Sequence, residues 1–159
     1  MKIFNLHKRI IQAHHEEIGD LMESLGSSND QIWPINKWPR MKLSKGLEVG
    51  SEGGHGPIRY TVSKYEPGKS VEFTFTRPRG FIGVHRFEIL KSDTFHTLIQ
   101  HEIKMSTSWI AYLKWILAIK WLHDALIENA FDRIDSRFLN EEVFTKWNIW
   151  VRILRFVLK

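Results

Sequence analysis

Residues 58–76, IRYTVSKYEPGKSVEFTFT, contain two segments in which apolar and polar residues alternate, separated by Pro67-Gly68. A period of two is typical of strands with one buried face, and a Pro-Gly pair is typical of a tight turn. A two-residue loop sets the register of the two segments and places their apolar side chains on one face. The resulting cross-strand pairs are Tyr60 with Phe75 and Val62 with Phe73. We therefore predict an antiparallel hairpin over these residues.

The period of two continues on both sides of the hairpin. It predicts further strands over Met41–Ser51, Ile82–Lys91 and Phe95–Met105, and an opening strand over residues 2–12. A Gly-rich turn over residues 53–57 is expected to lead into the hairpin. Consecutive strands joined by short loops favour an antiparallel sheet ordered as a meander.

The loop between the last two strands sets the position of two histidines. A three-residue loop over Ser92–Thr94 pairs Phe87 with Ile99. The next pair on that face is then His85 with His101. We therefore expect two histidines side by side on an otherwise apolar face of the sheet.

Helical periodicity appears in four places. A short amphipathic helix is predicted over Glu16–Leu25, and a second short turn or helix over Asn29–Trp33. A long helix begins after the capping hydroxyls of Ser106–Ser108 and runs to about Phe138, and a final helix covers Glu141–Leu158. The order of elements predicts an α+β fold of six or seven strands, with the long helix on one face of the sheet.

Length and composition fit one globular domain. The 159 residues are 43% hydrophobic and include seven Trp and ten Phe, so some aromatic rings are expected to line a cavity or an interface. The absence of cysteine excludes disulfides, thiolate metal sites and cysteine nucleophiles, and it fits the cytoplasm. The net charge of +5 is spread along the chain without a long basic run, so we expect no nucleic-acid partner.

We expect no segment to cross a membrane. The most apolar stretch, Trp109–Leu122, has 14 residues and contains Lys114 and Lys120. A spanning helix needs about 20 apolar residues. Charges also interrupt residues 1–9 before any apolar run develops, so we expect no signal peptide.

Several short motifs resemble those of a known superfamily. They are Ile32-Trp33-Pro34, Trp38-Pro39-Arg40-Met41, Gly53-Gly54-His55-Gly56-Pro57-Ile58-Arg59-Tyr60, Tyr65-Glu66-Pro67-Gly68 and Gly83-Val84-His85-Arg86-Phe87-Glu88. Over about residues 7–135 the chain resembles the SRPBCC superfamily, and in particular its uncharacterised bacterial members. That superfamily includes START lipid-transfer domains, birch-pollen-allergen-like proteins, and polyketide cyclases and dehydratases.

The resemblance implies a fold and a kind of site. It implies the helix-grip fold, in which a curved antiparallel sheet wraps around a long C-terminal helix, here with two short helices after the first strand. It also implies a deep cavity for an apolar ligand. It carries over no catalytic residue, because these positions match no shared catalytic motif.

The cavity wall can be predicted from strand alternation and from helical spacing. Trp33 and Trp38 are either plugs that fill one end of the core or an aromatic gate beside the entrance. His55 lies in a Gly-rich turn that either folds over the cavity mouth or simply joins two strands. The predicted ligand-binding set is Trp33, Trp38, Tyr60, Val62, Phe73, Phe75, His85, Phe87, Ile99, His101, Ile103, Ile116 and His123.

The histidines in this set allow three interpretations. They are neutral and satisfied within the core, or they bind the polar group of a ligand, or they act as acid and base in catalysis. No carboxylate is evident on the same face to support catalysis. No HExxH or similar spacing appears, so we predict no metal site and no cofactor.

The C-terminal residues form a second unit. Residues 1–138 are predicted to be the helix-grip domain and residues 139–159 an amphipathic helical extension. Its polar residues fall in a narrow sector that includes Arg152, Arg155 and Lys159, and most of the remaining surface is apolar. Such a helix packs on its own domain, on a dimer partner, or in the plane of a membrane surface.

The sequence favours binding over catalysis. We expect a non-catalytic carrier or sensor of a small hydrophobic molecule, such as a lipid or a polyketide-like metabolite. The alternative is a cyclase or dehydratase that uses the cavity histidines for acid-base chemistry. A third hypothesis is an interaction module that acts through the final helix.

Overall fold

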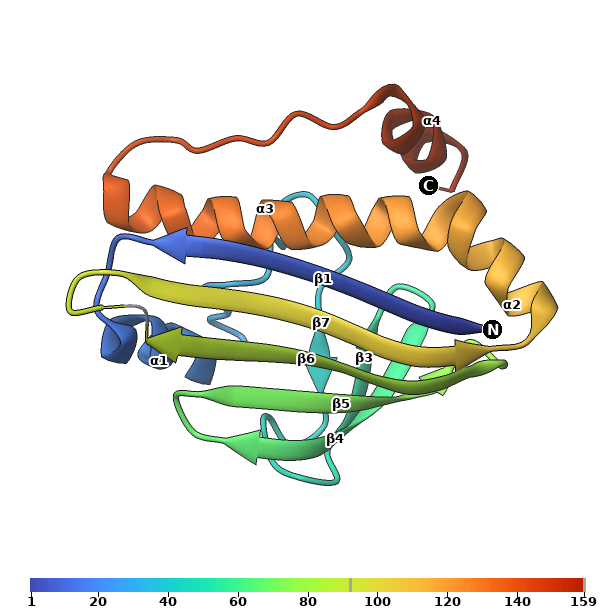
Figure 1. Ribbon diagram of the computed structural model, residues 1–159, viewed down its shortest axis with the longest axis horizontal. Coiled ribbons are helices and arrows are strands. Elements are labelled where there is room, and N and C mark those ends of the chain that lie inside the picture. Colours follow the sequence, from blue (N-terminus) through green and yellow to red (C-terminus); the bar gives the residue numbers. More distant parts are fainter. Residues whose placement is uncertain (92, 159) are drawn as a thin grey trace.

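The structure is a computed structural model that describes residues 1–91 and 93–158. It contains a seven-stranded antiparallel sheet in the order β1-β7-β6-β5-β4-β3-β2. Figure 1 shows that the sheet curves, that the long helix lies along one of its faces, and that the C-terminal segment crosses over that helix. The strands are β1 (Lys2–Ile11), β2 (Lys42–Leu43), β3 (Glu52–His55), β4 (Ile58–Glu66), β5 (Ser70–Arg77), β6 (Phe81–Lys91) and β7 (Thr97–Thr107).

The central hairpin has the predicted cross-strand pairs but a longer turn than predicted. Three residues, not two, separate Glu66 from Ser70, and a register shift between Val62 and Lys64 compensates for the extra residue. In the β4–β5 pair, Tyr60 lies opposite Phe75 and Val62 lies opposite Phe73. Tyr60, Val62 and Phe73 are almost fully buried. The main hydrophobic core includes these three side chains and the inner face of the long helix, so the hairpin supplies the floor of the core.

The register of β6 and β7 differs from the prediction by two residues. Phe87 lies opposite His101 rather than Ile99, and His85 lies opposite Ile103. The connection is longer than expected, because the carboxylate of Asp93 accepts the backbone N–H groups of residues 95 and 96 and holds them in a turn. Ser92, the first residue of the predicted loop, lies outside the described residues. A shift of two residues preserves the face of each side chain, so both histidines still lie on the apolar face.

The segment before the hairpin is less regular than its alternation suggests. The single strand predicted over Met41–Ser51 is replaced by the short strand β2 and an irregular loop. Gly46 and Gly50 adopt φ angles of 67° and 87°, and such positive angles do not occur in a continuous strand. The predicted Gly-rich turn is instead mostly strand β3, and only the residues after His55 form the turn.

One short helix, not two, follows β1. Helix α1 spans His15–Glu23 and buries Ile18. Residues 29–33, predicted as a second turn or helix, form turns around Asp30. One carboxylate oxygen of Asp30 accepts the N–H groups of Ile32 and Trp33, which ties down this segment without a helix.

The long helix is continuous but contains a π-helical turn. It comprises α2 (Trp109–Lys114), the π-helix η1 (Trp115–Ile119) and α3 (Lys120–Leu139). The π turn changes which side chains face inward, because it inserts an extra residue into the helical repeat. Trp115 is therefore buried, whereas Ile116, predicted to face the cavity, is 36% exposed. Beyond the π turn, Leu126 and Ile127 face inward as expected.

The C-terminal helix is shorter than predicted. Residues 141–148 are extended, and only α4 (Ile149–Val157) is helical. The carboxylate of Asp132 accepts hydrogen bonds from the backbone N–H and the hydroxyl of Thr145, both 2.8 Å long. These bonds hold the segment extended along α3. The predicted contribution of Lys159 to the polar stripe lies outside the described residues.

Helix α4 packs against the long helix. The indole N–H of Trp150 donates to the carbonyl of Leu117 at 2.9 Å, and Val151 is 2% exposed. Figure 1 shows α4 and α2 at the same end of the molecule. Within residues 1–91 and 93–158, no helix is long and apolar enough to span a membrane.

Candidate functional site

A cavity of about 580 Å³ opens between the concave face of the sheet, the long helix and α4. Its lining is mainly aromatic and aliphatic, and the ionisable side chains among it are four histidines and Arg155. The lining residues are Trp33, Trp38, Pro39, His55, Gly56, Pro57, Ile58, Phe75, Phe81, His85, His101, Ile103, Trp115, Ile119, Leu122, His123, Leu126, Ile127, Leu154, Arg155 and Leu158.

The predicted site residues divide into three groups. Those that line the cavity are Trp33, Trp38, Phe75, His85, His101, Ile103 and His123. Those that are buried in the core but do not border the cavity are Tyr60, Val62, Phe73, Phe87 and Ile99. Ile116 lies outside the cavity because of the π turn. Ligand binding by any of these residues stays a prediction.

Sequence reasoning missed several parts of the wall. Trp115 takes the place expected for Ile116, and no pattern in the sequence marks the π turn that exchanges them. His55, at the end of β3, lines the cavity together with Gly56 and Pro57. Leu154 and Arg155 come from α4, which was predicted as an amphipathic extension and was not included in the predicted ligand-binding set.

A row of histidine rings crosses the cavity wall. His55 Nδ1 lies 3.1 Å from the hydroxyl oxygen of Tyr60, and the Tyr60 ring packs edge-on against His85. His85 Nδ1 lies 3.3 Å from His101 Nε2, and the rings of His101 and His123 are 4.9 Å apart. The row therefore joins β3 to α3 across the sheet.

Three nitrogens in this row have no hydrogen-bond partner within the part of the chain that the structure describes. They are Nε2 of His85, Nδ1 of His101 and Nε2 of His123, and all three are buried. A buried polar atom without a partner costs about 1–3 kcal/mol. These nitrogens are therefore the groups of the wall that can form hydrogen bonds with a ligand or with water.

The cavity histidines are neutral at pH 7. Burial lowers the pKa of His55 to about 3, and it lowers the pKa values of His85 and His101 well below the usual value. Burial also lowers the pKa of His123, although its hydrogen bond to Asp124 acts in the opposite direction. A neutral histidine has one donor nitrogen and one acceptor nitrogen. The row thus offers hydrogen bonds without a net charge.

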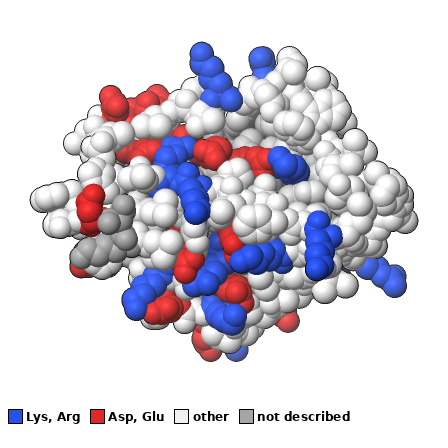
Figure 2. All heavy atoms as spheres, viewed as in Figure 1, with Lys and Arg blue, Asp and Glu red and all other residues white. Residues whose placement is uncertain are grey.

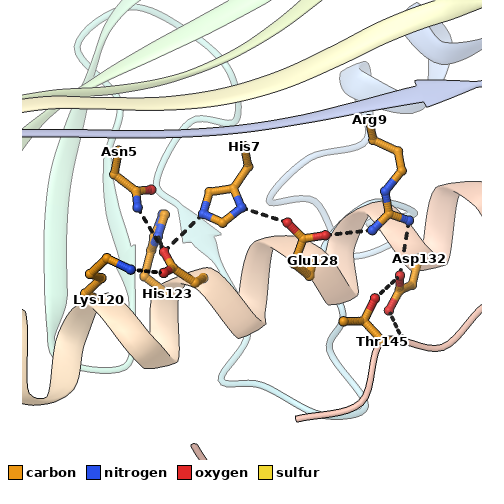
Figure 3. A network of polar contacts seen from close by, with 9 residues as sticks. Asn5, His7, Arg9, Lys120, His123, Glu128, Asp132 and Thr145 are labelled. Carbon is orange, nitrogen blue, oxygen red and sulfur yellow. Dashed lines mark hydrogen bonds and ion pairs between the residues drawn. The ribbon is translucent and has the colours of Figure 1, made fainter. Parts of the chain in front are cut away.

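A charged network lies behind this wall, between β1 and α3 (Figure 3). Asp124 contacts His123 on the cavity side, with 3.4 Å between Oδ1 and Nδ1. It also accepts hydrogen bonds from Asn5 and from Lys120, and it lies 3.0 Å from Nε2 of His7. Strand alternation could not place this carboxylate beside the histidines, because Asp124 lies on α3 and points toward β1 rather than into the cavity.

His7 is charged at pH 7. Burial alone would lower its pKa, but hydrogen bonds and charge interactions with Asp124 and Glu128 together raise it to about 9. Nδ1 of His7 lies 2.7 Å from a carboxylate oxygen of Glu128. Figure 3 shows that Glu128 also contacts Arg9, whose guanidinium continues to the carboxylate of Asp132. The network ties β1 to α3.

One group of side chains has the composition of a metal site. The ligand atoms of His7, His123 and Asp124 lie within 4.8 Å of one another. His7 is protonated, however, and a metal needs a neutral imidazole. Asp124 is already paired with the ammonium group of Lys120 at 2.6 Å. The arrangement favours an ion-pair network over a metal site.

Surface charge is mixed on the face seen in Figure 2. Lys and Arg alternate with Asp and Glu over the strands and along α3, and the end of the molecule that carries α2 and α4 is largely uncharged. Exposed apolar side chains at that end include Trp109, Ile110, Leu117, Phe156 and Val157. This face therefore shows no extended basic surface of the kind that binds nucleic acid.

Comparison with known proteins identifies the fold. No protein-family model and no curated protein matches the chain. A START superfamily protein from Mycobacterium smegmatis is 11% identical, with a TM-score of 0.57 over 86% of this chain and 97% of that chain. CalU16 from Micromonospora echinospora is 15% identical, with a TM-score of 0.60 over 96% of this chain and 82% of that chain.

An enzyme shares the same architecture. A norcoclaurine synthase point mutant from Thalictrum flavum, in complex with a transition-state analogue, is 9% identical, with a TM-score of 0.64 over 88% of this chain and 96% of that chain. These identities are too low to transfer a function. The chain has the helix-grip fold of START and related proteins, as the resemblance to the SRPBCC superfamily implied.

Proposed function

We propose that this protein binds a small hydrophobic molecule that carries a hydrogen-bonding group, as a non-catalytic carrier or sensor. A lipid or a polyketide-like metabolite fits this description. The observation that carries the proposal is the cavity of about 580 Å³, whose apolar wall contains buried histidine nitrogens without partners among the described residues. Binding pockets for small molecules commonly combine an apolar lining with a few placed polar groups.

The apolar side chains and the histidine nitrogens of the cavity wall contribute differently to ligand binding. Each CH₂ group that leaves water for an apolar cavity contributes about 0.8 kcal/mol. A ligand hydroxyl or carbonyl that meets His101 or His123 removes part of the cost of an unpartnered nitrogen. The cavity is therefore expected to prefer an amphipathic ligand to a pure hydrocarbon of the same size.

Native mass spectrometry of the purified protein tests the proposal. We expect a co-purified hydrophobic molecule, released on denaturation, and saturable binding of medium-chain alcohols by tryptophan fluorescence. Ile103 borders the cavity, so Ile103→Trp should fill it and weaken alcohol binding at least tenfold. The matched control is Ile82→Trp on the outer face of β6, where the side chain is 74% exposed. Equal binding by both variants would refute a cavity site.

A second candidate function rests on the His123–Asp124 pair. A proton on Nδ1 of His123 that points toward Asp124 leaves Nε2 free as an acceptor, which is the arrangement of a general base. The candidate is a cyclase or dehydratase that moves a proton on an apolar substrate. Under this hypothesis the wild type chemically converts the co-purified molecule and His123→Gln binds it unchanged. Under the carrier hypothesis both proteins return it intact.

A further inference from the structure

Arg155 is a cation in an otherwise apolar part of the cavity wall. It lies on α4, it is half-buried, and it lines the cavity next to Leu154 and Leu158. Among residues 1–91 and 93–158, its guanidinium has no ion-pair partner and no hydrogen-bond acceptor. Burial lowers its pKa, and no anion counteracts that effect. A partly buried guanidinium without an anion is costly unless a partner arrives from outside.

Two indole rings hold the guanidinium in place. Its central carbon lies 4.3 Å from the ring centroid of Trp38 and 4.5 Å from that of Trp147. These contacts are cation-π interactions, which engage the face of a guanidinium and leave its N–H groups free. The position of Arg155 is therefore fixed while its donors stay available.

Asn129 holds the indole rings of Trp38 and Trp147 in position. Its side-chain oxygen accepts the N–H of Trp38 at 3.0 Å and the N–H of Trp147 at 2.9 Å. Its amide nitrogen donates to Asp132 at 3.3 Å, and the residue is 3% exposed. A buried amide thus orients both rings, and Arg155 rests on a pre-formed support rather than on a flexible surface.

We infer that Arg155 binds the carboxylate or phosphate group of an anionic amphiphile whose apolar body occupies the cavity. The inference rests on the proposed function and specifies its ligand class. The planar guanidinium presents paired donors that match two oxygens of a carboxylate or a phosphate. The half-exposed position of α4 allows the anionic group to keep part of its hydration at the cavity rim.

Packing alone would give Arg155 a different role. The same cation-π contacts could serve only to attach α4 to Trp38 and Trp147. In that case the charge of a ligand would have no effect on its affinity. The two roles are therefore separated by ligands that share a chain and differ in head group.

The experiment compares dodecanoate with dodecan-1-ol, both below their micelle concentrations, by calorimetric titration of the full chain. We expect the wild type to bind dodecanoate at least tenfold more tightly than dodecanol, and dodecyl phosphate to share this preference. Acetate and inorganic phosphate should bind at least a hundredfold more weakly than dodecanoate, because they lack the apolar body. Tight binding of either small anion would overturn the inference, since the site would then not require an amphiphile.

Variants test whether Arg155 causes the preference for dodecanoate over dodecanol. Arg155→Gln should bind dodecanoate no more tightly than dodecanol, while Arg155→Lys should keep part of the preference. The matched control is Arg152→Gln, an exposed position on the same helix outside the cavity lining, which should keep the full preference. Loss of dodecanol binding in Arg155→Gln would show that Arg155 only attaches α4, and it would overturn the inference.

The proposed function and the inference fail in different ways. If the wild type binds dodecanol and dodecanoate equally, the cavity binds apolar ligands but Arg155 does not recognise an anion. If neither ligand binds, the proposed function fails and the inference fails with it.

Discussion

His85 and His101 contact each other diagonally across β6 and β7, with 3.3 Å between Nδ1 of His85 and Nε2 of His101. Each ring is at most 4% exposed. Two neutral histidines satisfy this contact with one shared proton, whereas two protonated rings would repel each other without nearby water. The wall of the cavity is therefore stable only while these histidines are neutral.

Acid is expected to destabilise the fold through this pair. Burial lowers both pKa values in the folded protein, and the unfolded value is about 6.5. The unfolded chain therefore binds more protons below pH 6.5, and stability that is present above this pH is lost as the pH falls. We expect the free energy of unfolding, measured in urea, to decrease continuously from pH 6.5 to pH 4.

Two variants separate the contribution of these histidines to the acid destabilisation from the contribution of the carboxylates. The double variant with His85→Gln and His101→Gln should show a shallower decrease over the same pH range. His96→Gln, in the loop between β6 and β7 where the imidazole is 43% exposed, should follow the wild type more closely. Parallel pH profiles for the wild type and the double variant would contradict the assignment.

Alkaline pH is expected to destabilise the protein through His7. The pKa of His7 is raised to about 9, so its stabilising contribution is fully present below pH 6.5 and is lost as the pH rises through 9. His7→Gln should lower the melting temperature at pH 6 and have little effect at pH 10. Thermal unfolding followed by circular dichroism checks this, with the partly exposed His15→Gln as control. An effect of His7→Gln that is the same at both pH values would count against a charged His7.

The faces of the sheet could be predicted from the sequence, but the register of β6 and β7 could not. Alternation alone puts His85 and His101 on the concave face, and a shift of two residues does not change that. The register depends on the loop between them, and Asp93 lengthens this loop by binding backbone N–H groups. Nothing in the apolar pattern encodes that choice.

The helices show a second limit of pattern reasoning. Helical spacing predicts an inward Ile116 on the assumption of a regular repeat, and the π turn exchanges it for Trp115. Arg155 was assigned to the narrow polar sector of the final helix, and its contact with the distant Trp38 could not be predicted from that helix alone. The apolar character of the site was predictable, whereas the contacts made by the C-terminal segment depend on tertiary packing.

The core of the hairpin should dominate stability. Phe73 is fully buried, and its ring packs against Tyr60 and His85. Phe73→Ala should cost about 3–5 kcal/mol, because it removes apolar contacts and leaves a cavity. Ile82→Ala, on the exposed face of β6, should change stability by less than about 0.5 kcal/mol. Guanidinium unfolding compares the two, and a small effect of Phe73→Ala would contradict the packing described for the hairpin.

Asn129 should couple the cavity wall to the C-terminal segment. Asn129→Ala removes the acceptor of the indole N–H groups of Trp38 and Trp147. The N–H of Trp38 is then buried without a partner at a cost of about 1–3 kcal/mol, while the half-buried Trp147 can turn toward water. We expect lower stability in guanidinium and faster proteolysis within residues 141–148, because Trp147 no longer anchors that segment. Asn36→Ala, at an exposed position, should change neither, and an unchanged cleavage rate in Asn129→Ala would show that the segment is held by other contacts, such as those of Thr145 with Asp132.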